Sequence, residues 1–105
     1  MDSRGVQLVE IVAKIADLAI RRACNLSYDV SALPPSLRSA ALEIIERVAS
    51  QLVVHDGDTL RCKLCGRGPF TRKGLYLHIR RVHLDQVYEI TRRELEDYIW
   101  RLRNL

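Results

Sequence analysis

A mostly α-helical protein with one small β-hairpin is the fold that this sequence of 105 residues predicts. Three segments carry apolar residues at helical spacing, and a short segment between them has a turn signal flanked by strand-like residues. Hydrophobic residues make up 48% and charged residues 29%, which is typical of a folded chain rather than a disordered one. We expect an N-terminal helix pair in residues 1–55, a metal-bound ββα unit in 56–84 and a C-terminal helix in 85–105.

The first predicted helix covers residues 6–24 and has only a narrow polar stripe. Nearly all residues outside the stripe are Val, Leu, Ile or Ala. The stripe, whose members recur at steps of three and four, consists of Gln7, Glu10, Lys14, Asp17 and Arg21. A helix that is apolar over most of its circumference must be covered on several sides.

A second helix is predicted to begin at Pro34-Pro35-Ser36, because proline is tolerated in a first helical turn. Its single apolar face is formed by Leu37, Ala41, Ile44, Ile45, Val48 and Leu52. One such face covers only one side of the first helix, and the C-terminal helix, which could cover a second side, must also serve the finger. Some apolar residues of the first helix are therefore expected to stay partly exposed in a monomer. These residues are Val9, Val12, Ala13, Ala16 and Ile20. We therefore expect a homodimer built on the N-terminal helices; the competing structure is a monomer whose long helices close one core.

The hairpin and the last helix are predicted from local signals. Residues 53–55 and 58–62 read as strands around Asp56-Gly57, a strong two-residue turn signal. Thr91 followed three residues later by Glu94 is the pattern of a capping box, which predicts that the last helix begins there. Leu95, Ile99 and Leu102 then form one apolar stripe.

A single Cys/His motif lies between the hairpin and the last helix. Its residues Cys62, Cys65, His78 and His83 have the spacing Cys-x2-Cys-x12-His-x4-His. Two thiolates on a tight turn and two imidazoles on one helix can surround a metal ion tetrahedrally. Sulfur and nitrogen ligands favour zinc over metals that prefer oxygen. We expect one structural Zn²⁺ per chain and no enzyme activity, because protein side chains fill all four positions and leave none for a substrate.

Residues 60–83, which we call the finger, resemble the C2H2 zinc-finger family. That family has an apolar residue two before the first Cys, a central Phe and a Leu three before the first His; Leu60, Phe70 and Leu75 match. Phe70 lies one residue later than usual and follows Pro69, which argues against a regular strand there. The resemblance implies a ββα unit that zinc holds together, because so short a unit buries too little apolar surface to fold alone.

The positive charge of the chain is concentrated in the finger. The chain has a net charge of +4, but residues 61–83 contain seven basic side chains and no acidic one. Such a segment indicates phosphate binding, and the resemblance makes DNA a better candidate than RNA. The predicted nucleic-acid contacts are Arg61, Lys63, Arg67, Arg72, Lys73, Arg80 and Arg81.

Base-specific reading is not expected from this finger. By resemblance, Thr71, Gly74 and Leu77 occupy the positions that read bases, and none is an Arg, Asn or Gln able to make two hydrogen bonds to one base. We therefore predict backbone contacts, with specificity from dimerisation or DNA shape. The alternative is a protein–protein adaptor in which the finger docks through Tyr76, Leu77 and Ile79, although apolar residues at helical spacing also pack against flanking helices.

Further features narrow the setting of the protein. No apolar run reaches the ~18 residues that span a membrane, and no secretory signal opens the chain, so we expect an intracellular protein of the cytoplasm, nucleoid or nucleus. Cys24 is expected to be a buried, inert thiol. Arg outnumbers Lys by 14 to 3 while Asn, Gln and Met are scarce, a composition that suits a heat-loving source and planar phosphate contacts.

Overall fold

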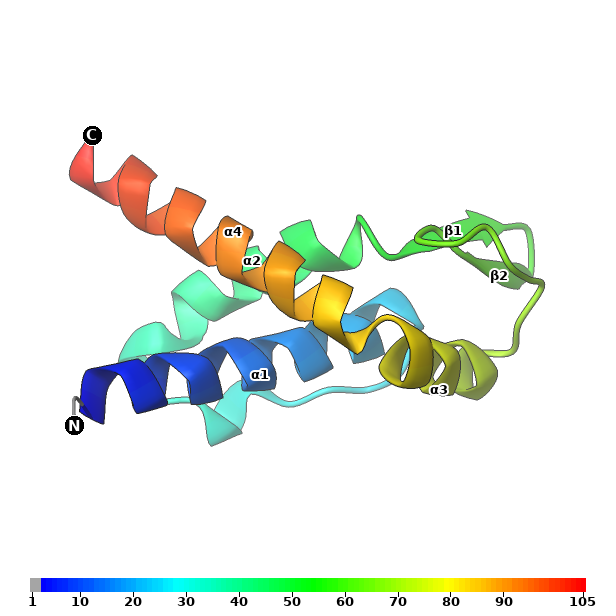
Figure 1. Cartoon of the computed structure of the whole chain (residues 1–105), viewed down its shortest axis with the longest axis horizontal. Coiled ribbons are helices and arrows are strands. Elements are labelled where there is room, and N and C mark those ends of the chain that lie inside the picture. Colours follow the sequence, from blue (N-terminus) through cyan, green and yellow to red (C-terminus); the bar gives the residue numbers. More distant parts are fainter. Residues whose placement is uncertain (1–2) are drawn as a thin grey trace.

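The computed structural model describes residues 3–105, with side chains from Leu8 onward, and confirms the mostly helical fold with one two-stranded hairpin. Helices α1 (Ser3–Ala23) and α2 (Arg38–Ala49) form the N-terminal pair, and a loop with two 3-10 turns (Val30–Ala32 and Pro35–Leu37) joins them. Strands β1 (Val53–Asp56) and β2 (Thr59–Cys62) follow, and helices α3 (Arg72–Val82) and α4 (Leu84–Arg103) complete the chain (Figure 1).

One core joins the helices to the finger. Helices α1, α2 and α4 pack on one another, and the hairpin and α3 lie at one end of this bundle (Figure 1). The largest fully buried apolar side chains come from the helices of the bundle, from the loops on either side of α2 and from the finger: Ile20, Leu33, Ile44, Ile45, Leu52, Leu75, Ile79, Val48 and Val87. The metal-ligand region is therefore packed into the same apolar cluster as the helix pair.

The expected exposure along α1 is confirmed for its first half only. Val9 is exposed, and Val12 and Ala13 are half-buried. Ala16 and Ile20 are fully buried, so the expectation that they stay partly exposed in a monomer was wrong. The physical reason is that both α3 and α4 pack against α1 in addition to α2.

The hairpin turn lies one residue later than predicted. Strands β1 and β2 pair antiparallel in a register that sets Asp56 opposite Thr59, so the two turn residues are Gly57 and Asp58. Gly57 has a φ of +63°, a left-handed conformation that glycine adopts without steric cost.

The predicted capping box at Thr91 and Glu94 is wrong, because α4 begins seven residues before Thr91, at Leu84. Thr91 is fully buried inside the helix, and its hydroxyl donates to the Val87 carbonyl at 2.7 Å. This bond satisfies the hydroxyl without ending the helix. A threonine cap is found at α3 instead, where Thr71 Oγ1 accepts the Gly74 N–H at 3.0 Å.

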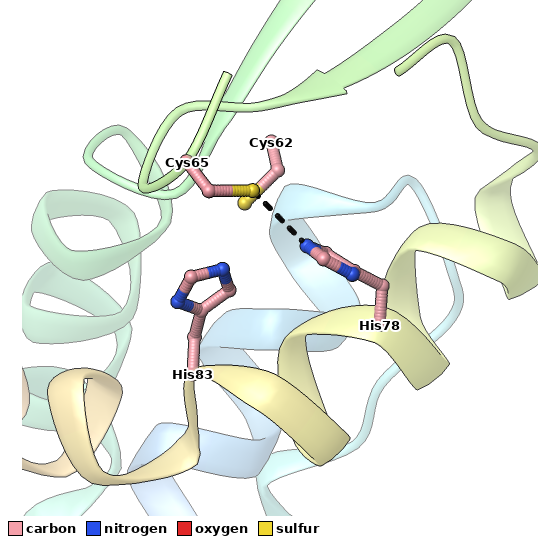
Figure 2. A group of neighbouring side chains, drawn as sticks. All are labelled: Cys62, Cys65, His78 and His83. Carbon is pink, nitrogen blue, oxygen red and sulfur yellow. Dashed lines mark hydrogen bonds between the residues drawn. The ribbon is translucent and has the colours of Figure 1, made fainter. Parts of the chain in front are cut away.

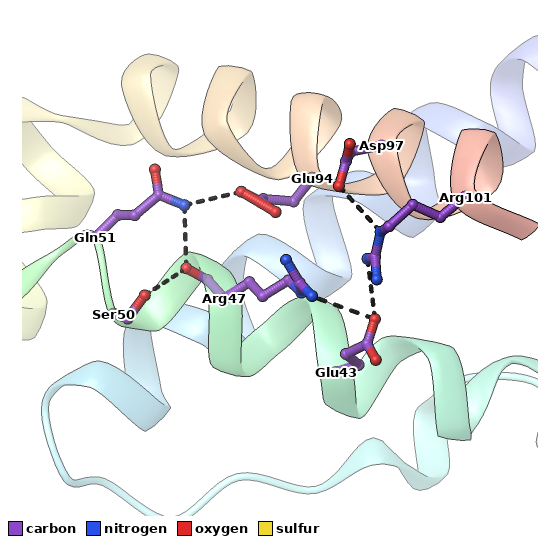
Figure 3. Close-up of polar contacts among 7 residues, drawn as sticks. All are labelled: Glu43, Arg47, Ser50, Gln51, Glu94, Asp97 and Arg101. Atoms are coloured by element: carbon purple, nitrogen blue, oxygen red, sulfur yellow. Dashed lines mark hydrogen bonds and ion pairs between the residues drawn. The ribbon is translucent and has the colours of Figure 1, made fainter.

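Polar side chains link the outer half of α4 to α2 and to the turn that follows α2 (Figure 3). Arg101 donates to Glu43 at 3.1 Å, and Gln51 donates to Glu94 at 3.1 Å. Helices α1 and α4 diverge towards the chain ends (Figure 1). Within residues 3–105, no helix combines the length and the apolar character needed to cross a membrane.

Candidate metal centre

Four side chains from four successive parts of the finger converge on one point (Figure 2). Cys62 ends β2, Cys65 lies in the loop that follows, His78 is on α3, and His83 lies between α3 and α4. Their ligand atoms all lie within 4.8 Å of one another, and Cys65 Sγ is 3.3 Å from His78 Nε2. All four residues predicted as ligands are therefore close enough to hold a metal ion.

Backbone hydrogen bonds shape the loop that carries the two cysteines. The Cys62 N–H donates to the Arg67 carbonyl at 2.8 Å, and the Gly66 N–H donates to the Cys62 carbonyl at 2.8 Å. Gly66 has a φ of +78°, which lets the chain turn tightly after Cys65. The two sulfurs are thus held on one side of a closed turn.

The finger strand at Phe70 is a single bridge rather than a regular strand. Phe70 pairs with Leu60, and its N–H donates to the Leu60 carbonyl at 2.8 Å. This agrees with the prediction from Pro69. The Phe70 ring stacks on the His78 imidazole, with centroids 4.8 Å apart, and Leu75 is fully buried in the core.

His83 is oriented for ligation through Nε2. Helix α3 ends at Val82, and the His83 N–H still donates to the Ile79 carbonyl at 2.8 Å, which keeps the ring on the side of His78 despite the five-residue spacing. His83 Nδ1 is hydrogen-bonded to Gln86 Oε1. With its proton on Nδ1, the imidazole has a free lone pair on Nε2. Among the described residues, this buried Nε2 has no hydrogen-bond partner.

The two thiols differ in their surroundings. The backbone N–H of Arg67, together with both histidine rings, lowers the pKa of the Cys65 thiol to about 6. Burial raises the pKa of the Cys62 thiol, although the backbone N–H groups of Leu64 and Cys65 oppose that effect. Thiolates are the form that binds metals, so the lowered pKa of the Cys65 thiol favours ligation by Cys65.

The seven predicted nucleic-acid contacts are not equivalent in the structure. Lys63, Arg67, Arg72, Lys73 and Arg81 are exposed. Arg61 is half-buried, and its guanidinium donates to the carbonyls of Gly66 and Gly68. Arg80 forms an ion pair with Asp17 of α1 at 2.8 Å, so its charge is compensated within the chain.

The contacts of Asp17 with the finger were not predicted from the sequence. Its carboxylate accepts the Tyr76 hydroxyl at 2.7 Å, as well as guanidinium N–H groups of Arg80 at 2.8 Å and Arg21 at 3.1 Å. No local pattern indicates a contact between residues 59 to 63 positions apart. Gln86 was also missed, but its position three residues after His83 on a helix was a usable signal.

The structure also shows how far the remaining residues singled out in the sequence are buried. Cys24 is fully buried, and burial raises the pKa of its thiol to about 12, which agrees with an inert thiol. Ile79 is fully buried in the core, whereas Leu77 is exposed. Tyr76 is half-buried against α1 through Asp17.

Comparison of the chain with models of protein families, with curated proteins and with solved structures gave no match. The resemblance to C2H2 zinc fingers is thus carried by the ligand spacing and the finger residues alone.

Proposed function

We propose that Cys62, Cys65, His78 and His83 bind one structural zinc ion, and that the zinc-bound finger binds nucleic acid through the phosphate backbone. The zinc assignment is supported by the donor set, since two sulfurs and two nitrogens suit zinc. In a tetrahedral zinc site, sulfur and nitrogen ligands lie about 3.6 Å apart, close to the 3.3 Å between Cys65 Sγ and His78 Nε2.

Two further observations favour a bound ion. His83 Nε2 is buried and has no hydrogen-bond partner among the residues that the structure describes, which costs free energy, and a metal ion would supply the missing partner. Zinc carries two positive charges, which the Cys62 and Cys65 thiolates neutralise. The role of the ion is structural: it supplies the folding energy that the short finger lacks.

Zinc binding is tested by metal analysis of the purified chain and by cobalt substitution. We expect about one zinc per chain and the visible absorption of thiolate-bound tetrahedral cobalt. Cys65→Ser should abolish both signals, while Cys24→Ala, which alters the non-ligand thiol, should retain them. A folded chain that contains no zinc and is unchanged by chelator contradicts the assignment.

The nucleic-acid proposal depends on one observation, the exposed basic surface of the finger. Five of its seven basic side chains are exposed, and no acidic residue occurs between positions 61 and 83. Lys73 and Arg81 are exposed on α3, and Lys63 and Arg67 are exposed around the cysteine turn. This clustering of cations is the electrostatic pattern of a phosphate-binding surface.

The base-reading positions of the family favour backbone contact here. Thr71 Oγ1 accepts a hydrogen bond from its own helix, Gly74 has no side chain, and Leu77 is apolar. None of them makes paired hydrogen bonds to a base edge. We therefore expect weak sequence preference and strong salt dependence, with duplex DNA bound better than RNA.

A gel-shift series with duplex DNA, single-stranded DNA and structured RNA tests the proposal. Each probe is used at two salt concentrations, with zinc-loaded and chelator-treated protein. If roughly four phosphates are engaged, log K falls with log salt at a slope of about −3.6 on duplex DNA. Reversing Lys73 and Arg81 to Glu should weaken binding to every sequence, whereas Arg103→Glu, outside the finger, serves as the control.

The protein–protein adaptor is retained as a second candidate because α3 exposes apolar side chains. Leu77 is 45% and Val82 is 61% exposed. Nucleic-acid binding that is absent at low salt, or insensitive to salt, would favour this candidate over the first.

A further inference from the structure

One side of α3 carries an apolar side chain between two cations. Lys73, Leu77 and Arg81 follow one another at steps of four residues, so they lie along one side of the helix. All three are exposed, and Leu77 is 45% exposed. The opposite side of α3 carries Leu75 and Ile79, which are fully buried in the core. We call the exposed side, formed by Lys73, Leu77 and Arg81, the outer face of α3.

Gly74 keeps the outer face low beside Leu77. It lies three residues before Leu77, which puts it next to Leu77 on the helix surface, and it has no side chain. A Cβ atom at Gly74 would lie 2.9 Å from Thr71 Oγ1, so a larger residue would disturb the cap of α3. Between its two cations, the outer face therefore presents backbone at Gly74 and the apolar side chain of Leu77.

The spacing of the two cations matches the width of the major groove of DNA. Eight residues separate Lys73 from Arg81, and a rise of 1.5 Å per residue puts their Cα atoms about 12 Å apart. The major groove of B-DNA is also about 12 Å wide. A helix that lies across this groove brings one cation to the phosphates of each strand and sets Leu77 over the base edges between them.

The position of α3 in the molecule suits an approach by a duplex. The finger lies at the end of the molecule opposite both chain termini (Figure 1). Residues 61–83 contain no acidic side chain, so the finger itself does not oppose the charge of the outer face. Arg80, at the edge of this face, instead pairs with Asp17 of α1 at 2.8 Å. The charge of the outer face is therefore that of Lys73 and Arg81.

We propose that the outer face of α3 lies across the major groove of duplex DNA and that Leu77 contacts the C5-methyl groups of pyrimidines there. This inference rests on the proposed function and names the feature of the duplex that the finger favours. The thymine methyl is an apolar group that the major groove exposes. Contact with Leu77 removes both apolar groups from water, which stabilises the complex without hydrogen bonds to a base. The finger should therefore prefer duplexes rich in thymine.

The same contact gives a physical reason for a preference for DNA over RNA. Uracil lacks the C5-methyl group, so an RNA helix offers Leu77 no equivalent apolar contact. The major groove of A-form RNA is also deep and narrow, and side chains cannot read it. The outer face of α3 therefore fits duplex DNA by both its spacing and its chemistry.

Competition binding by the zinc-loaded full chain tests the methyl contact. Two duplexes of one sequence are compared, the first with thymine and the second with deoxyuracil, which lacks only the C5-methyl group. Burial of one methyl group predicts a roughly fourfold preference for the thymine duplex. A duplex with 5-methylcytosine in place of cytosine should likewise be bound roughly fourfold more tightly than its unmethylated form. Leu77→Ala should remove both preferences and leave the salt slope unchanged.

Val82→Ala is the matched control for Leu77→Ala. Val82 is 61% exposed on α3, but it lies about 140° around the helix from Leu77, so this variant should keep the wild-type methyl preference. Any effect of the missing methyl groups on DNA shape would persist in Leu77→Ala, which separates shape from side-chain contact. Lys73→Gln and Arg81→Gln should each reduce the salt slope by about 0.9 and retain the methyl preference.

Each outcome bears on a different part of the proposal. Salt-dependent binding with equal affinity for the thymine and deoxyuracil duplexes overturns the methyl contact but not the phosphate contacts. A methyl preference that persists in Leu77→Ala overturns it as well. Binding to neither duplex at low salt overturns the proposed function together with this inference. Because Leu77 is exposed, its variant should keep the wild-type helix content and zinc, which circular dichroism and metal analysis check.

Discussion

Asp17 joins the finger to the helix pair, and its removal gives a quantitative test of how the two are coupled. One carboxylate oxygen accepts the Tyr76 hydroxyl at 2.7 Å and an Arg80 N–H at 2.8 Å, and the other accepts Arg21 at 3.1 Å. Burial alone would raise the pKa of the Asp17 carboxyl, but the hydrogen bonds from Tyr76 and Arg21 and the nearby positive charges hold that pKa below its ordinary value. The carboxylate is thus stabilised in its charged form.

The expected cost of Asp17→Ala is about 2–3 kcal/mol of unfolding free energy. A hydrogen bond from Tyr76 to a charged acceptor contributes about 1.5–3 kcal/mol, and the partly exposed pair with Arg80 contributes at most about 1 kcal/mol. Because the Asp17 side chain is 31% exposed, water weakens both contacts. The expected cost therefore lies below the sum of the two upper values. Asp17→Asn keeps an acceptor for Tyr76 and should cost only about 1 kcal/mol.

Urea and thermal unfolding of the zinc-loaded protein measure these values, with Asp97→Ala as the matched control. Asp97 makes an ion pair within α4 only, so its loss should change stability little. A double-mutant cycle that combines Asp17→Ala with Tyr76→Phe should give a coupling free energy on the order of 1 kcal/mol. If Asp17→Ala costs no more than Asp97→Ala, the interaction does not hold the finger to α1.

The pH dependence of the Asp17 variant has a defined sign. Because the folded pKa of Asp17 is lowered, its contribution is complete above the unfolded value of about 4 and is lost as the pH falls through the folded pKa. The stability difference between wild type and Asp17→Asn should therefore narrow in acid. A difference that grows below pH 4 would contradict this reasoning.

Three further predictions follow from local contacts. Thr71→Ala removes the cap of α3 and should cost about 1 kcal/mol in urea unfolding, whereas Thr71→Ser should cost little because it keeps the hydroxyl. Gln86→Ala removes the partner of His83 Nδ1 and should lower zinc affinity by roughly 10-fold or more in a chelator competition. In protein stripped of metal whose helix content shows that the helix pair is intact, an alkylating reagent at pH 7 should modify the exposed Cys65 and spare Cys24, which is fully buried beside α1; zinc should protect Cys65.

The ligand set was predictable because metal ligation depends on the types of the residues and on their spacing in the sequence. Two cysteines in a tight turn, with one histidine on the following helix and a second just after its end, leave few alternatives, and the structure brings all four together. The helices were predictable for a similar reason, since apolar periodicity extends over many residues in α1 and α2.

Element ends were less predictable because one residue satisfies several patterns. Thr91 suits a helix cap, but its hydroxyl is equally satisfied by the Val87 carbonyl within α4. Asp56-Gly57 and Gly57-Asp58 are both acceptable turns, and the pairing of Asp56 with Thr59 selects the second. Tertiary contacts decide between such options, and a short sequence window does not contain them.

Tertiary contacts also change the net charge of the finger, and this change affects the proposed function. Counted along the chain, residues 61–83 carry seven uncompensated cations, yet Asp17, 63 residues before Arg80, neutralises one of them. Asp17→Asn therefore has a second readout besides stability. It should free Arg80, strengthen duplex DNA binding several-fold at low salt and steepen the salt slope by up to about 0.9. Equal or weaker binding by the folded variant would mean that the Arg80 side of α3 does not face the nucleic acid, which would limit the phosphate-binding surface to Lys73, Arg81 and the cysteine turn.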